Sequence, residues 1–227
     1  MSLLGSAALA MWWDIAPQVL ADFEDWHSHE HFTERLGIPG FRRATRWRDV
    51  AGGAGIFVMY ELDDHAVLSS APYLARLNAP TPWSTRMMPN HRNMIRSQCR
   101  VLESAGGAVA RHALTVRLSP EPGRADALQA ALKARIEALP TRPGVIGAHL
   151  LQHQAPPIAP TTEQQIRGLR DQVADWVLVA CGYDLAAIQG LANGEFGEHR
   201  LRDAGAAEGT VVGLYAVTHS ATPRDIG

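Results

Sequence analysis

A single offset of 104 residues relates two parts of the chain, and this internal repeat constrains the fold more than any other feature of the sequence. The offset places residues 8–15 on residues 112–119, both rich in apolar side chains. The same offset places the Pro-Gly pair at 39–41 on the Pro-Gly pair at 143–145. Because two separate landmarks agree on one shift, we expect two copies of one structural pattern.

Hydrophobic periodicity predicts the same order of elements in both copies. Helices are expected at 17–36, 65–77, 124–139 and 185–201, and strands at 8–15, 41–48, 55–62, 95–103, 112–119, 145–154, 175–183 and 210–219. The order β-α-β-β-α-β is that of a ferredoxin-like sandwich, whose helices cover one face of the sheet. We therefore predict an α+β fold with two domains, residues 1–106 and 107–227. The two ferredoxin-like repeats would pack sheet to sheet as an intramolecular dimeric α/β barrel.

Two segments lie outside the repeat and are long enough to suggest a function. Residues 78–93 contain Trp83, two methionines and His91, which could form an adaptable lid over an apolar ligand. From this lid Arg86 or Arg92 could pair with an anionic group of the ligand. Residues 154–171 read as an extended arm that leads into a short helix.

Composition and short motifs exclude several classes of function. The chain has 21 Lys and Arg against 23 Asp and Glu, and no basic run longer than Arg42-Arg43, so we expect no nucleic-acid partner. The longest apolar stretch, residues 7–13, is far shorter than the roughly 20 residues of a membrane span, so no membrane association and a cytoplasmic location are expected. Cys99 and Cys181 lack Cys-x-x-Cys spacing and read as core thiols. No nucleotide-binding signature occurs, and no cofactor is expected.

One segment resembles a known family. Trp26-His-Ser-His-Glu-His31, followed by Glu34-Arg35-Leu36 and Ile38-Pro39-Gly40-Phe41, resembles the W-x-x-x-E-H … R/L … P-G-F segment of the EthD-like branch of the dimeric α/β-barrel superfamily. The resemblance covers residues 23–48. The superfamily includes quinone-forming monooxygenases, polyketide cyclases, lactone isomerases and haem proteins, and fold alone does not choose among them.

The resemblance implies that Glu30 and His31 face a cavity. The offset of 104 residues sets Ala134 and Arg135 opposite them, and Ala131 opposite His27, so we expect the site in the first half. An imidazole beside a carboxylate can act as a general base near neutral pH. The alternative interpretation is that these polar residues form the solvated end of an amphipathic helix.

The same histidines could also serve as metal ligands. His27 and His31 are four residues apart and could share an ion with His91 as a third ligand. The pattern lacks the Glu beside the first His that marks His-Glu-x-x-His sites, so no metal is expected.

Aromatic residues complete the predicted site. Trp12 and Trp13 are adjacent on a strand and must face opposite ways, so one of them should face the cavity. Tyr60 could donate a hydrogen bond to a phenolate or carbonyl oxygen. The predicted catalytic residues are His31, Glu30 and Tyr60, and the predicted ligand-binding residues are Trp12, Trp26, His27, Trp83, Arg86, Met88 and His91.

The sequence therefore predicts a cofactor-independent enzyme that acts on a hydrophobic aromatic or polyketide-like carbonyl or phenolic compound. Its chemistry would be monooxygenase-, cyclase- or isomerase-like, with His31 as base, oriented by Glu30. One alternative is a ligand-binding or structural barrel without activity. Another is a haem-binding barrel with His27, His31 or His91 as axial ligand. Exposed sheet edges would allow a homodimer.

Overall fold

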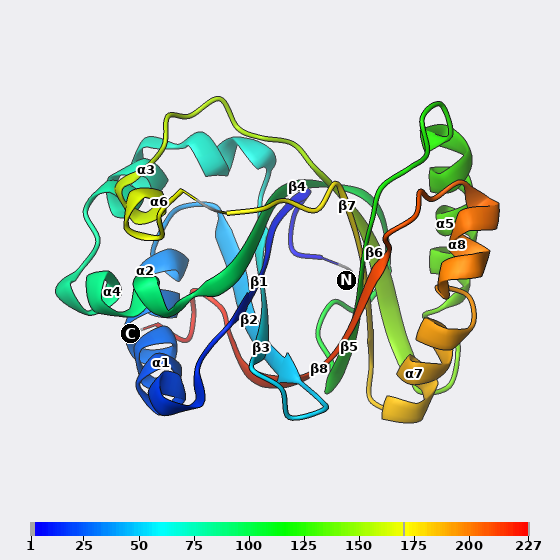
Figure 1. Ribbon diagram of the computed structural model, residues 1–227, viewed down its shortest axis with the longest axis horizontal. Coiled ribbons are helices and arrows are strands. Elements are labelled where there is room, and N and C mark those ends of the chain that lie inside the picture. Colours follow the sequence, from blue (N-terminus) through cyan, green and yellow to red (C-terminus); the bar gives the residue numbers. More distant parts are fainter. Residues whose placement is uncertain (1–2, 170, 227) are drawn as a thin grey trace. The chain divides into compact units, whose positions relative to one another are not determined.

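The computed structural model describes residues 3–169 and 171–226 as a mixed α+β structure (Figure 1). Contacts divide the chain into two compact units. The N-terminal unit comprises Leu4–Arg100, Gln154–Val173 and Thr218–Gly227, and the C-terminal unit comprises Met1–Leu3, Val101–His153 and Ala174–Val217. The boundaries thus differ from the two sequence halves, because the arm at 154–173 packs with the N-terminal unit.

The N-terminal unit contains three strands of its own and most of the short helices. In chain order these are β1 (Ala7–Asp14), η1 (Pro17–Val19), α1 (Leu20–Trp26), η2 (His27–His31), α2 (Phe32–Leu36), β2 (Phe41–Asp49), β3 (Gly55–Leu62), η3 (His65–Ser69), α3 (Ala71–Asn78), α4 (Pro82–Met87), η4 (Met88–Asn90) and α6 (Thr162–Ile166).

The C-terminal unit repeats the pattern with longer helices. Its elements are β5 (His112–Leu118), α5 (Ala125–Ala138), β6 (Val145–His153), β7 (Trp176–Gly182), α7 (Leu185–Asn193) and α8 (Glu198–Ala204). The single helix expected at 185–201 is divided, because Gly194 adopts a non-helical conformation after α7 and Gly197 caps α8. In each unit the helices lie on one side of the strands (Figure 1).

Two long strands, β4 (Arg92–Gly106) and β8 (Val211–Ala221), contribute residues to both units. Strands β1 and β2 pair antiparallel with β3, and β1 also pairs with β4. Strands β5 and β6 pair antiparallel with β7, and β5 also pairs with β8. The hydrogen-bonded order β1-β3-β2-β8-β5-β7-β6-β4 closes on β1. This closed order confirms the predicted α+β fold of the dimeric α/β-barrel type.

The two Pro-Gly turns have the same backbone geometry. Gly40 and Gly144 have φ angles of +95° and +84°, a region that favours glycine. A Cβ at Gly40 would lie 2.4 Å from Val67 Cγ2, and one at Gly144 would lie 2.5 Å from Ala187 Cβ. Each glycine therefore lets the chain turn tightly beneath the helical segment that follows the middle strands.

The two units have separate hydrophobic cores of different character. The N-terminal core is rich in aromatic side chains, among them Phe23, Trp26, Phe32, Tyr60 and Tyr73. The C-terminal core is mainly aliphatic and contains Leu114, Leu128, Leu132, Ile136, Leu150 and Leu178.

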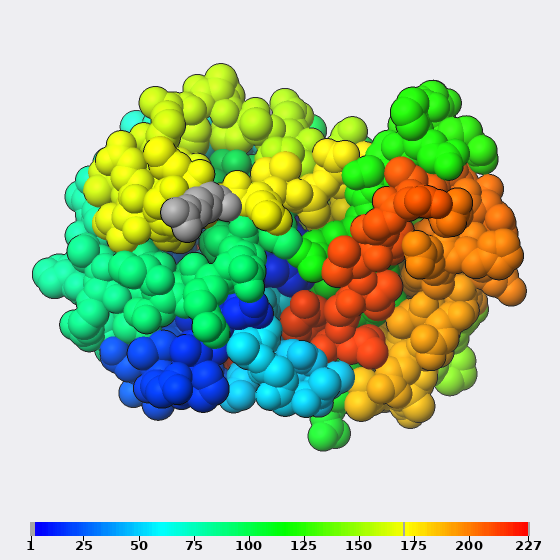
Figure 2. Space-filling model, in the orientation of Figure 1, coloured from blue at the N-terminus to red at the C-terminus, as the bar shows by residue number. Residues whose placement is uncertain are grey.

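Both segments outside the repeat contain short helices. The lid segment at 78–93 forms α4 and η4, and Thr81 caps α4 by accepting a hydrogen bond from the Ser84 amide. The arm at 154–171 contains α6, which begins with a capping box between Thr161 and Gln164. Figure 2 shows the yellow segment around α6 against the blue-green segment of α4 and η4.

Within residues 3–169 and 171–226, no helix combines the length and apolar character that a membrane crossing requires.

Candidate active site

The N-terminal unit encloses a cavity of about 40 Å³ between its sheet, its helices and the arm that carries α6. A space of this size holds about three water molecules. The lining residues are Leu9, Met11, Trp13, Trp26, His27, His31, Arg35, Tyr60, Tyr73, Leu77, Met88, His91, Met94, Arg96, Glu163 and Arg167. The lining therefore combines aromatic and aliphatic side chains with histidines, arginines and a glutamate.

A π-helical turn places two histidines in this cavity. In η2 the Phe32 amide donates to the His27 carbonyl oxygen, so the turn holds one residue more than an α-helical turn. The rings of His27 and His31 stack with centroids 5.3 Å apart and an interplanar angle of 28°. Such turns occur frequently at functional sites. The sequence prediction of one regular helix over 17–36 is wrong at this point.

Tryptophan rings pack against two of the histidines, Trp26 against His31 and Trp13 against His91. The His31 and Trp26 ring centroids are 4.5 Å apart, and those of His91 and Trp13 are 4.9 Å apart. His27 packs on Phe32 with centroids 4.4 Å apart. Three imidazoles thus share one aromatic enclosure.

Burial keeps these imidazoles neutral at neutral pH. It lowers the pKa of both His27 and His31 well below the usual 6.5, and nearby positive charge, including that of Arg35 beside His31, lowers both further. Burial also lowers the pKa of His91 to about 4. Neutral imidazoles can accept a proton from a bound molecule.

Four buried polar atoms of the lining residues have no hydrogen-bond partner among the described residues. They are Trp13 Nε1, His27 Nδ1, His31 Nδ1 and the Tyr60 hydroxyl. Burial raises the pKa of Tyr60 well above its usual value, so this hydroxyl stays protonated and is a hydrogen-bond donor. Since buried polar groups are normally paired, four orphans around one cavity indicate a place for a polar ligand.

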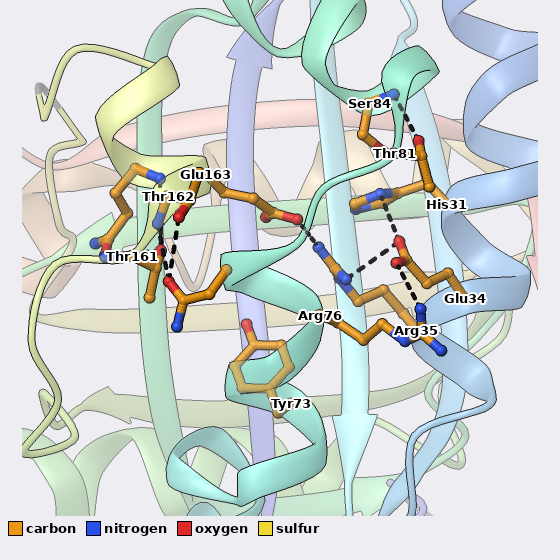
Figure 3. A network of polar contacts seen from close by, with 12 residues as sticks. His31, Glu34, Arg35, Tyr73, Arg76, Thr81, Ser84, Thr161, Thr162 and Glu163 are labelled. Carbon is orange, nitrogen blue, oxygen red and sulfur yellow. Dashed lines mark hydrogen bonds and ion pairs between the residues drawn. The ribbon is translucent and has the colours of Figure 1, made fainter.

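A buried ion pair joins the arm to the first helix. Arg35 donates to Glu163 of α6, and its guanidinium lies 3.4 Å from a Glu34 oxygen (Figure 3). Burial alone would lower the pKa of Arg35, but Glu163, together with Tyr73, Glu34 and Tyr60, outweighs it, and the net shift is upward. Arg167 is held in turn by Asp171, at 2.7 Å. The arm is therefore anchored to the cavity wall by charge.

The carboxylate beside His31 is Glu34 rather than Glu30. His31 Nδ1 lies 4.0 Å from Glu34 Oε2 (Figure 3). Glu30 instead accepts hydrogen bonds from Trp26 Nε1 at 3.1 Å and from Thr81 Oγ1 at 2.5 Å. The predicted orientation of His31 by Glu30 is thus corrected, because Glu30 ties the first helix to the start of α4.

The structure separates the other predicted ligand-binding residues into two groups. Trp26, His27, Met88 and His91 line the cavity, as does the predicted catalytic Tyr60. Trp12, Trp83 and Arg86 do not. Trp12 lies on the opposite sheet face from Trp13 and stacks on Phe57 at 5.0 Å. Trp83 Nε1 donates to Asp22 at 2.9 Å, and the largely exposed Arg86 pairs with the same carboxylate at 3.6 Å. On α4 the fully buried residues are Ser84 and Met87, and Trp83 is only partly buried against the core.

Several lining residues were not among the predicted ones. They are Leu9, Met11, Trp13, Arg35, Tyr73, Leu77, Met94, Arg96, Glu163 and Arg167. Period-two alternation along the last strand of the first half could have pointed to Arg96. Nothing in the sequence shows that Glu163, 128 residues from Arg35, would reach it.

A surface groove of about 490 Å³ adjoins the cavity. His91, Met94 and Arg167 line both the groove and the cavity. The cavity and the groove therefore share these three side chains as a common wall. No three His, Cys, Asp or Glu side chains in 3–169 and 171–226 are arranged to hold a metal ion.

No protein-family model matches the chain, and no curated protein matches it. Several solved structures share its fold. An anthrone oxidase-like protein has a TM-score of 0.65 at 11% identity, over 100% of this chain and 97% of that one. A candidate monooxygenase from Fusobacterium nucleatum subsp. nucleatum has a TM-score of 0.64 at 8% identity, over 97% and 96% of the two chains. Another from Lactobacillus acidophilus has a TM-score of 0.59 at 10% identity, over 96% and 97%. These likenesses show the ferredoxin-like α/β-barrel fold alone, and membership of the EthD-like branch stays a prediction.

Proposed function

We propose that this chain is a small-molecule monooxygenase of the ferredoxin-like type that oxidises an aromatic compound with an acidic C–H or O–H group, without a bound cofactor. The observation that carries the proposal is the set of four unpartnered polar atoms around one aromatic cavity. The likeness in fold to a candidate monooxygenase and to an anthrone oxidase-like protein supports the same reaction class.

His31 is the proposed base. It is neutral, its ring packs on Trp26, and Glu34 lies near enough to stabilise the imidazolium that forms. The nearby Arg35 charge disfavours a protonated His31 in the empty cavity. A substrate anion formed in the cavity offsets that charge, so the proton transfer leaves a compensated ion pair.

Tyr60 and Trp13 are the proposed donors to the substrate oxygen. Both carry a buried donor without a partner, and donors that meet a developing oxyanion stabilise the transition state. Glu30 is a positioning residue, because it fixes Trp26 and Thr81 rather than facing the cavity.

The reaction balances without a further reductant. For an anthrone, His31 accepts a proton from the methylene carbon, and the resulting carbanion transfers electrons to dioxygen. One oxygen atom forms the new carbonyl group, and the other leaves as water with the two methylene hydrogens. The substrate carbon is oxidised and dioxygen is reduced.

The cavity must enlarge to admit such a substrate, since drug-sized ligands occupy about 300 to 1,000 Å³. His91, Met94 and Arg167 line both the cavity and the surface groove. Their movement would join the two spaces.

The test is oxygen consumption by purified protein with anthrone as substrate, combined with the absorbance of the anthraquinone formed. We expect stoichiometric oxygen uptake that depends on the protein and is lost in His31→Ala. Binding of anthrone without oxygen uptake would replace the proposal by a ligand-binding function. A Soret band in the purified protein would favour the haem-binding alternative.

A further inference from the structure

Three arginines line the cavity, and they differ in how their charge is balanced. Arg35 pairs with Glu163 and Glu34, and Arg167 pairs with Asp171. Among the described residues no carboxylate forms an ion pair with Arg96, which is only 7% exposed. A buried cation without a counter-charge is costly, so this position calls for an anion.

Among residues 3–169 and 171–226, the side chain that accepts a hydrogen bond from the Arg96 guanidinium is that of Tyr73. Arg96 Nη2 donates to the Tyr73 hydroxyl at 2.7 Å. The hydroxyl accepts this bond and keeps its own proton for another acceptor. Arg96 also keeps donors on its remaining nitrogens. Together the two side chains can offer three or more donors to a planar carboxylate.

The strand register places this pair at a defined distance from the histidines. Arg96 on β4 pairs with Met11 on β1, two residues along β1 from Trp13. Paired residues share one sheet face, and two residues along a strand span roughly 7 Å. Trp13 in turn packs on His27 and His91. A ligand whose aromatic ring lies beside the histidines could therefore place a substituent on the far end of that ring against Arg96.

The arm cannot neutralise Arg96 with its own acidic residues. Glu163 is committed to Arg35 and Asp171 to Arg167. The arm instead fixes the Arg96 backbone, because the Arg96 amide donates to the Gln172 carbonyl oxygen at 2.8 Å. The guanidinium is thus positioned while its charge remains uncompensated.

We propose that Arg96 and Tyr73 form a carboxylate-binding subsite, so that the ligand of this cavity is an aromatic carboxylate. This inference rests on the proposed function for the identity of the cavity as the active site. It adds a substrate class that the likeness in fold does not supply.

The test measures binding without turnover, by isothermal titration calorimetry under nitrogen. The probes are 2-naphthoate and its neutral isostere 2-naphthamide, at pH 7.5. We expect the native protein to bind 2-naphthoate about 10- to 100-fold more tightly, the range of a charge-assisted hydrogen bond. Arg96→Met should abolish this preference, and Arg96→Lys should keep part of it.

Arg86→Met is the matched control, because Arg86 lies on α4 outside the cavity and is largely exposed. It should leave the preference unchanged. Arg96→Met should melt at the native temperature or above it, since it removes an unbalanced buried charge. Equal affinities for the two probes in the native protein, or an unchanged preference in Arg96→Met, would overturn the subsite.

The oxygen assay keeps this inference separate from the proposed function. Arg96-dependent binding of 2-naphthoate without oxygen uptake from any tested phenol or anthrone supports the subsite and rejects the monooxygenase. Oxygen uptake together with equal affinities for both probes supports the monooxygenase and rejects the subsite.

Discussion

The first helical segment of the N-terminal unit and helix α5 of the C-terminal unit occupy equivalent places in the β-α-β-β-α-β order, but they bury different chemistry. In α5 the buried positions are Leu128, Leu132 and Ile136, spaced by four residues. In the N-terminal unit Phe23, His27 and Phe32 are spaced by four and then five residues. The π turn η2 absorbs the extra residue, and it adds His31 to the inward side.

The histidines of the two units differ in the same way. His149 on β6 is fully buried, and both of its ring nitrogens are bonded, to Ser104 at 2.8 Å and to the Gly107 carbonyl oxygen at 3.1 Å. His27 and His31 each leave Nδ1 without a partner. A satisfied buried histidine stabilises its own surroundings, whereas unsatisfied ones around a cavity are available to a ligand.

The largest expected effect comes from truncating His31 in the first helical segment and comparing it with truncation of the equivalent residue of α5. His31→Ala should lower the rate of oxygen uptake by about 100- to 10,000-fold, the usual contribution of a general base. Arg135→Ala, at the position 104 residues later, should leave the rate unchanged. Steady-state oxygen consumption measures both, and circular dichroism checks that each variant is folded. Equal rates in His31→Ala and the native protein would remove His31 from the mechanism.

The ion pairs of the two units provide the next test. Glu163→Gln leaves Arg35 buried without its main partner and should lower the free energy of unfolding by about 3 to 5 kcal/mol. Glu195→Gln weakens the pair with Arg142, which is 41% exposed, and should cost less than about 1 kcal/mol. Urea denaturation compares the two variants. Similar losses in both would show that the arm is not anchored through Glu163.

Acidification should destabilise both units through their buried histidines. Burial lowers the pKa of His149 from 6.5 to about 4, so between these pH values the unfolded chain binds the proton and the folded chain does not. The free energy of unfolding therefore falls as the pH drops from 6.5 towards 4, by up to about 3 kcal/mol for this group. In His149→Gln this part of the pH dependence should disappear. Urea denaturation between pH 4 and 7 measures it, and an unchanged slope contradicts the assignment.

The smallest effect is expected outside the cavity. Arg86→Ala removes an exposed ion pair with Asp22 and should change the free energy of unfolding by less than about 1 kcal/mol. Oxygen uptake should stay at the native rate. A loss of activity in this variant would return α4 to the lid role that the sequence suggested.

The fold could be predicted from the sequence because its evidence is periodic and repeated. Alternating apolar residues fixed the strands to within a few residues, and the Pro-Gly turns at Gly40 and Gly144 indicated where each first helix ends. Such local patterns carry most of the information about secondary structure.

The site could be predicted only in part, since its residues meet through tertiary contacts. The histidine cluster at 27–31 was visible as a change from apolar to polar residues. The π turn was not visible, and without it Glu30 seemed to be the partner of His31. Glu163 lies on an arm that follows no repeat, 128 residues from Arg35, so their contact has no local signature.

The extra residue in η2 also has an evolutionary meaning. Deleting Ser28 would restore an α-helical turn and would rotate the side chains before it by about 100° relative to those after it. Phe23, His27 and Phe32 would then be spaced by four residues throughout, as the buried residues of α5 are, and the π turn would be lost. A gain or loss of one codon is therefore enough to switch this helix between the four-residue spacing of α5 and the five-residue spacing seen between His27 and Phe32.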